Sequence, residues 1–176
     1  ILALTKIVEN GYQGALMAPT EVLAAQHFKT FQQVFKGMPI KTAYLSGHTK
    51  AAERKEILEQ LKDGSIHILI GTHALIEENV VFSALGLVIT DEQHRFGVKQ
   101  RQALESKGKS PHVLIMTATP IPRTMALSVY GDLDVSFIKG MPPGRHPVKT
   151  YVVGSHMLQR IFRFMKKEME SGHQAY

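Results

Sequence analysis

Two adjacent carboxylates, Asp91 and Glu92, directly follow an apolar run at residues 87–90. Such a run predicts a buried strand of a parallel sheet, and ligands of open α/β sheets bind just beyond the carboxyl ends of the strands. Neighbouring acids are costly to bury, so a balancing cation is favoured, and Mg²⁺ bound to phosphates is the usual one. Asp91 would hold the metal through water, and Glu92 would orient an attacking water. Alternatively, the pair only caps the helix or loop that follows.

Composition sets the limits within which such a site can be interpreted. The 176 residues suit one domain and the start of another, and 44% hydrophobic and 20% charged residues are ordinary for a globular protein. The absence of cysteine excludes disulfides and thiolate chemistry. No apolar stretch reaches the roughly 18 residues of a membrane span and no signal peptide opens the chain, so we expect a cytoplasmic protein without a membrane partner. The net charge of +6 is compatible with a polyanionic partner but does not require one.

The elements that must position the acids alternate along the chain. Short aliphatic runs followed by segments of helical periodicity predict βαβ units and a parallel sheet. Thr20 is the expected N-cap of one helix, with Glu21 in its first turn, and Asn10-Gly11 is a helix stop. We expect strands at 14–17, 41–45, 66–70, 87–90 and 112–116, and helices at 1–10, 22–35 and 51–61.

Small polar clusters follow each of these strands. Because right-handed crossovers bring the carboxyl ends of parallel strands to one edge, the clusters are expected to share that edge. They lie at residues 19–20, 46–47, 71–72, 91–92 and 117–119. Their recurrence favours a functional edge, although Gly and Thr also end strands simply to turn the chain.

The domain organisation is predicted from a composition change near the C-terminal end. Residues 139–147 are rich in Pro and Gly, which is typical of a linker between domains. We therefore predict a first domain at 1–138, including a short helix at 124–130. The start of a second α/β domain is predicted at 148–176, with a strand at 148–153, a helix at 157–170 and another strand opening at 174.

Four sequence motifs resemble those of the RecG family of superfamily 2 DNA helicases. Residues 91–101 begin Asp-Glu-Gln-His, and residues 117–124 read Thr-Ala-Thr-Pro-Ile-Pro-Arg-Thr. Residues 18–21 and 71–76 resemble the DNA-contacting motifs of the same family. The motifs occur in the family's order and span nearly the whole chain. The Asp-Glu-Gln-His form favours RecG over the related transcription-repair coupling and replication-restart helicases.

The resemblance implies a RecA-like parallel sheet flanked by helices, of the P-loop NTPase type, in a motor of two such domains. ATP·Mg²⁺ would bind between the domains, and the motor would translocate on duplex DNA and remodel stalled forks and branched junctions. By the same resemblance Asp91 coordinates Mg²⁺, Glu92 is the catalytic base, and Gln93 and His94 sense the γ-phosphate. His94 alone could instead be a polar residue at the sheet edge.

Further roles follow from the resemblance. Thr117 and Thr119 would couple the nucleotide state to the grip on DNA. Small residues and exposed amides can reach phosphates, and the residues expected at the DNA backbone are Pro19, Thr20, Gly71, Thr72 and His73.

One departure from the family bears on function: the 176 residues contain no Gly-x-x-x-x-Gly-Lys-Ser/Thr loop. An ATPase needs backbone amides and a lysine on the phosphates, so we interpret the chain as an excerpt of a longer motor, inactive alone and dependent on the remaining domains of its polypeptide. The alternative is a non-catalytic DNA-binding or scaffold module that has lost its ATPase activity. Lys107 and Lys109 are interpreted as a solvated charged face.

Overall fold

The computed structural model describes residues 1–92, 96, 98–118, 134–138, 140, 144 and 148–175. The chain divides into two compact units, Ile1–Met125 and Ala126–Tyr176. Most of the predicted linker 139–147 lies outside the described residues, and so does the predicted helix at 124–130. The domain limits predicted from the sequence therefore stay a prediction.

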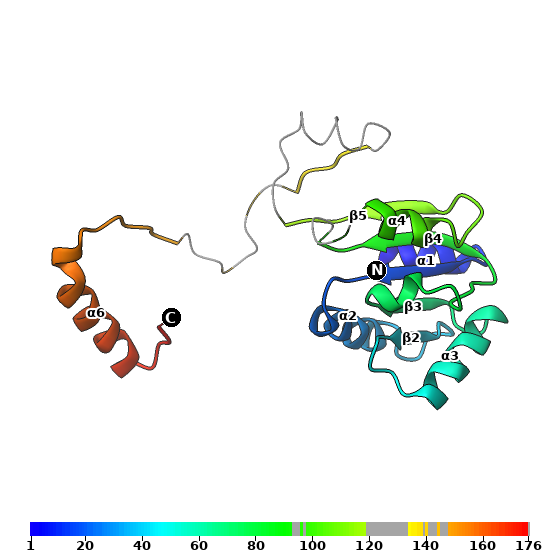
Figure 1. Ribbon diagram of the computed structural model, residues 1–176, viewed down its shortest axis with the longest axis horizontal. Coiled ribbons are helices and arrows are strands. Elements are labelled where there is room, and N and C mark those ends of the chain that lie inside the picture. The colour runs from blue at the N-terminus through cyan, green and yellow to red at the C-terminus, as the bar shows by residue number, and fades with distance from the viewer. Residues whose placement is uncertain are drawn as a thin grey trace. The chain divides into compact units, whose positions relative to one another are not determined.

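A five-stranded sheet forms the centre of the first unit (Figure 1), in the order β2-β3-β1-β4-β5. Every pair of neighbouring strands in it is parallel. The strands are β1 (Gln13–Met17), β2 (Thr42–Leu45), β3 (Ile68–Gly71), β4 (Leu85–Thr90) and β5 (His112–Ile115). The predicted α/β fold with a parallel sheet is confirmed, and each strand lies within two residues of its predicted limits.

Helices cover both faces of this sheet. Successive strand residues point to opposite faces, so β3 sends Ile68 and Ile70 to one apolar cluster and Leu69 to the other. The first cluster includes side chains of α1 (Leu2–Glu9) and α2 (Glu21–Val34). The second includes side chains of α3 (Ala51–Lys62), α4 (Val98–Glu105) and the 3₁₀ helix η1 (His73–Ile76). Each fully buried large side chain contributes about 1.5–3 kcal/mol, so the two clusters stabilise the packing of the helices on the sheet.

Local signals start and stop these helices where the sequence predicts. The hydroxyl of Thr20 accepts the Leu23 N–H at 3.3 Å, which confirms it as the N-cap of α2. Gly11 has a φ of +80° directly after α1, a conformation that glycine adopts without a side-chain clash. Sequence analysis did not predict α4, which begins six residues after Glu92.

The second unit contains η3 (Ser155–Met157) and α6 (Leu158–Glu170), which confirms the predicted helix at 157–170. The predicted strand at 148–153 is wrong, because these residues form no strand. A strand needs a neighbour for its main-chain hydrogen bonds, and no described segment pairs with this one. Residues 174 and 175 form no strand either, and residue 176 is outside the described part. None of the described helices has the length and apolar character to cross a bilayer.

Candidate functional site

The carboxyl ends of all five strands meet at one edge, as the sequence predicts. Met17 pairs with Gly71 on one side and with Thr90 on the other. Leu45 pairs with Gly71, and Thr90 pairs with Ile115. The five polar segments that follow these strands therefore leave the sheet at the same level.

The strand order sorts these segments into two groups. The segments expected at DNA follow β1 and β3, on one side of the sheet, and the segments with the acids and Thr117 follow β4 and β5. The chain leaves β1 toward β2 and leaves β4 toward β5, so the two connections diverge from neighbouring strands. Ligands of open α/β sheets bind at such a divergence, which here lies beside Asp91.

Three contacts at the end of β4 hold Asp91. Its main-chain N–H donates to the Met17 carbonyl at 3.0 Å. Its Oδ1 accepts the Glu92 N–H at 3.0 Å, and its Oδ2 lies 2.7 Å from Nε2 of His27 on α2. The side chain of Asp91 is 20% exposed, so solvent or a ligand reaches it. The acid is thus fixed and still accessible.

Glu92 has a φ of +50°, in the left-handed region that non-glycine residues rarely adopt. Such a conformation costs about 1–3 kcal/mol and concentrates at functional sites. The turn separates the two acids: Asp91 directly follows β4, and the chain changes direction at Glu92. Both side chains are partly buried.

The residues at this edge fit the Mg²⁺ ion that the resemblance implies. Hard cations prefer oxygen ligands, and Mg²⁺ keeps several of its waters. The two oxygens of a carboxylate offer about four lone-pair positions, and the two contacts made by Asp91 leave room for a metal-bound water. Asp91 can therefore hold the metal through water, with Glu92 beside it.

The structure describes some of the other predicted site residues and not all of them. Thr117 is exposed two residues beyond the end of β5, at the same edge as the acids. Gln93, His94 and Thr119 lie outside the described residues, so their roles stay predictions.

The residues expected at DNA differ in exposure. Thr20 and His73 are exposed, and Pro19 is partly buried between β1 and α2. Gly71 is buried, and a Cβ there would meet the Leu45 carbonyl oxygen, so close packing of β3 against β2 already explains the glycine. Thr72 is 2% exposed, and its hydroxyl has no hydrogen-bond partner among the described residues.

Comparison with known proteins identifies the family. The DEAD/DEAH box helicase family matches residues 1–127, which is more than half of the chain. The chain belongs to the DEAD/DEAH box helicase family. Its acids Asp91 and Glu92 are the first two residues of the four-residue motif quoted above.

Relatives within this helicase family confirm the resemblance to RecG. The ATP-dependent DNA helicase RecG of Bacillus subtilis (strain 168) is 54% identical over 99% of this chain. The RecG of Aquifex aeolicus (strain VF5) is 47% identical over the whole chain. The chain covers 26% and 22% of these two proteins. It therefore corresponds to about a quarter of the curated relatives that it matches.

Solved helicase structures agree with the fold. A structure of RecG bound to a three-way DNA junction shares 46% identity over 97% of this chain, with a TM-score of 0.81, and the match covers 23% of that protein. The helicase MrfA bound to DNA and AMPPNP is 20% identical with a TM-score of 0.56 over 73% of this chain, which shows the fold alone. The predicted RecA-like architecture is thus confirmed.

Sequence analysis missed an ion pair on the side of the sheet edge where DNA is expected to bind. Nδ1 of His48, in the loop after β2, lies 2.8 Å from Oε1 of Glu21 at the start of α2. The hydrogen bond from His48 holds the pKa of Glu21 below its usual value, and the same bond raises the pKa of His48. Because His48 and Glu21 are 27 residues apart, no local sequence pattern predicts the pair.

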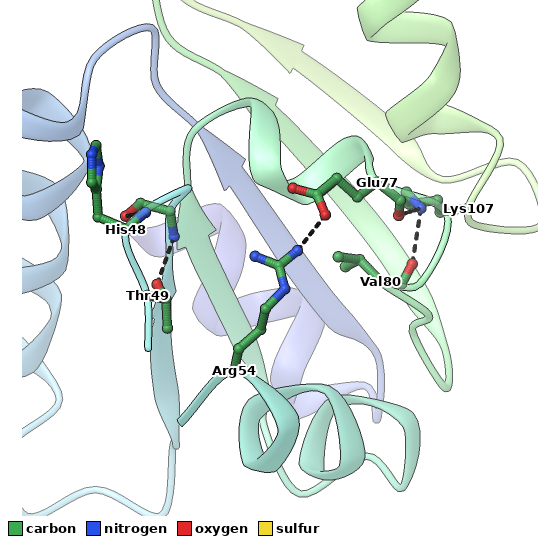
Figure 2. A network of polar contacts seen from close by, with 7 residues as sticks. His48, Thr49, Arg54, Glu77, Val80 and Lys107 are labelled. Atoms are coloured by element: carbon green, nitrogen blue, oxygen red, sulfur yellow. Dashed lines mark hydrogen bonds and ion pairs between the residues drawn. The ribbon is translucent and has the colours of Figure 1, made fainter. Parts of the chain in front are cut away.

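A second missed network braces the segment that follows β3 (Figure 2). Lys107, after α4, donates to the main-chain carbonyls of Glu77 at 2.7 Å and Val80 at 2.9 Å. Arg54 of α3 pairs with the Glu77 carboxylate. Burial lowers the pKa of Lys107. The prediction of a solvated face is therefore only partly right for Lys107, which is partly buried and whose ammonium group donates to two carbonyls, whereas Lys109 is exposed as predicted.

Proposed function

We propose that the chain is part of an ATP-driven DNA translocase of the RecG type. ATP·Mg²⁺ would bind beside Asp91 and Glu92, and the side of the edge that follows β1 and β3 would contact the DNA backbone. The observation that carries the proposal is the acid pair at the end of β4, next to the end of β1, where the two connections diverge. The names of its relatives, ATP-dependent DNA helicases, support the same conclusion.

The acids would divide the chemistry between them. Bound Mg²⁺ would neutralise charge that develops on the transferred phosphoryl group. Asp91 would hold a water of the metal, and Glu92 would orient the attacking water as general base. Gln93 and His94 would lie next along the chain at the γ-phosphate. The left-handed turn at Glu92 supports two separate roles, because the chain changes direction between the two acids.

The DNA contacts would be to phosphates. Thr20 and His73 are exposed at the edge and can approach a phosphate directly, while Pro19, Gly71 and Thr72 would shape the surface. Such contacts carry no base information, so binding by the complete protein should weaken steeply with salt and depend little on sequence. The net charge of +6 supports this expectation.

Thr117 and Thr119 would couple the nucleotide state at the acids to the grip on DNA. In the complete protein, Thr117→Ala with Thr119→Ala should retain much of the DNA-stimulated ATPase and lose far more of the unwinding of forked DNA. A melting temperature on the same preparation controls for stability. Proportional loss of both activities with a lowered melting temperature would instead show that the threonines only stabilise the fold.

The physiological part of the proposal is the remodelling of branched DNA and stalled forks in repair and recombination. It requires the remaining domains of the polypeptide, so the 176-residue chain alone should show no ATP hydrolysis above background. A cytoplasmic location belongs to the same proposal, because a translocase works in the compartment that holds its DNA.

Glu92→Gln in the complete protein tests the proposal. The variant should bind ATP·Mg²⁺ and lose hydrolysis, because it keeps the size of the side chain and removes the base. Glu53→Gln, an exposed residue of α3, is the matched control and should keep full activity. Unchanged kcat in Glu92→Gln would reject the assignment. A wild-type protein that binds DNA without any ATP hydrolysis would favour the non-catalytic module.

A further inference from the structure

His27 contacts Asp91, the acid beside the divergence between β1 and β4. It belongs to the second turn of α2, the helix that Thr20 caps, and its Nε2 is 2.7 Å from Oδ2 of Asp91. The two side chains are 29% and 20% exposed. They are 64 residues apart in the sequence, so only the packing of α2 on the sheet brings them together.

With this contact, both oxygens of the Asp91 carboxylate accept a hydrogen bond. Oδ1 accepts the Glu92 N–H at 3.0 Å, which still leaves the carboxylate free to tilt about that bond. A carboxylate oxygen accepts, so Nε2–H of His27 donates to Oδ2. With both oxygens engaged by donors on different segments, the carboxylate has one orientation. Hydrogen bonds to an ionised carboxylate are among the stronger ones, and this one is 2.7 Å long and partly buried.

We infer that His27 is a positioning residue for Asp91: its Nε2–H holds the carboxylate in the orientation that receives a water of the bound Mg²⁺. The inference rests on the proposed function of Asp91. Partners that orient metal ligands typically change metal affinity 10- to 100-fold when they are replaced. Because Asp91 acts through water, we expect the lower end, a loss of about tenfold.

The competing explanation is that His27 only packs α2 against the sheet. Two substitutions separate the explanations in the complete protein. His27→Leu keeps an apolar body and removes the donor, while His27→Gln places an amide N–H near the position of Nε2. His112→Asn is the matched histidine control, because His112 is exposed at the opposite end of β5.

The experiment measures binding of a fluorescent ATP analogue as Mg²⁺ is titrated, with a melting temperature for each variant. His27→Leu should raise the Mg²⁺ concentration at half-saturation about tenfold, with binding recovered at high Mg²⁺. His27→Gln should restore most of the affinity, and His112→Asn should match the wild type. The same order should appear in the Mg²⁺ dependence of DNA-stimulated ATP hydrolysis.

A double-mutant cycle with Asp91→Asn completes the test. If His27 acts through Asp91, adding His27→Leu to Asp91→Asn should change the half-saturating Mg²⁺ concentration by less than about twofold. A full tenfold effect in that background, or no effect of His27→Leu in the wild type, would overturn the inference and leave the proposed function intact. An Asp91→Asn protein with unchanged Mg²⁺ dependence would overturn the metal role of Asp91 itself, and the inference with it.

Discussion

Gln13, at the start of β1, gives the sharpest test of how this sheet is held together. Gln13 is 3% exposed, and its amide group makes three hydrogen bonds inside the protein. Nε2 donates to the carbonyls of Leu61 at 2.9 Å and Ile66 at 2.7 Å. Oε1 accepts the Ala84 N–H at 3.0 Å. One amide therefore connects the end of α3, the entry to β3 and the entry to β4.

Gln13→Met keeps the length of the side chain and removes all three bonds. The Leu61 carbonyl retains the Gly64 N–H, so the losses fall on the Ile66 carbonyl and the Ala84 N–H. A buried polar group without a partner costs about 1–3 kcal/mol. Since Ile66 is 1% exposed and the Ala84 bond is part-buried, we expect a total loss of about 2–4 kcal/mol.

Urea unfolding of the 176-residue chain, followed by far-UV circular dichroism, measures this loss. Gln33→Met on the exposed face of α2 is the matched control and should stay within about 0.5 kcal/mol of the wild type. Gln13→Glu should cost more than Gln13→Met, because a carboxylate cannot donate to either carbonyl and brings charge into a buried position. A Gln13→Met variant as stable as the Gln33→Met control, at the same m-value, would refute the reasoning.

Three further predictions concern the edge and its supports. Gly71→Ala should lower the free energy of unfolding by about 1–3 kcal/mol because the added methyl meets a carbonyl oxygen of β2; Gly47→Ala, with open space around it, should be neutral in the same urea assay. Lys107→Met should lower the free energy of unfolding by about 1–3 kcal/mol by leaving the Val80 carbonyl without its donor, while the Glu77 carbonyl keeps the Val80 N–H; an unchanged unfolding midpoint would contradict this. His48 should titrate above the ordinary pKa of about 6.5 in an NMR experiment, since its hydrogen bond to Glu21 raises its pKa. Both partners are charged between the lowered pKa of Glu21 and the raised pKa of His48, and the ion pair is lost as pH rises through the latter. Glu21→Gln should return the inflection of His48 to its ordinary position.

The sequence predicted what depends on neighbours along the chain. The apolar runs and the cap at Thr20 placed five strands and the first helices within a few residues, because periodicity and capping are local. The acids Asp91 and Glu92 were predicted at a strand end for the same reason. The strand predicted at 148–153 was wrong, because an extended segment becomes a strand only when another one pairs with it.

The tertiary structure alone decided which side chains meet. The order β2-β3-β1-β4-β5 sets β1 beside β4, although two strands separate them in the sequence. That neighbourhood brings His27 to Asp91, and the packing of α4 brings Lys107 to the carbonyls of Glu77 and Val80. Gly71 likewise has its reason in a carbonyl of the adjacent strand. These contacts depend on how crossovers pack on the sheet, a long-range property that no local spacing encodes.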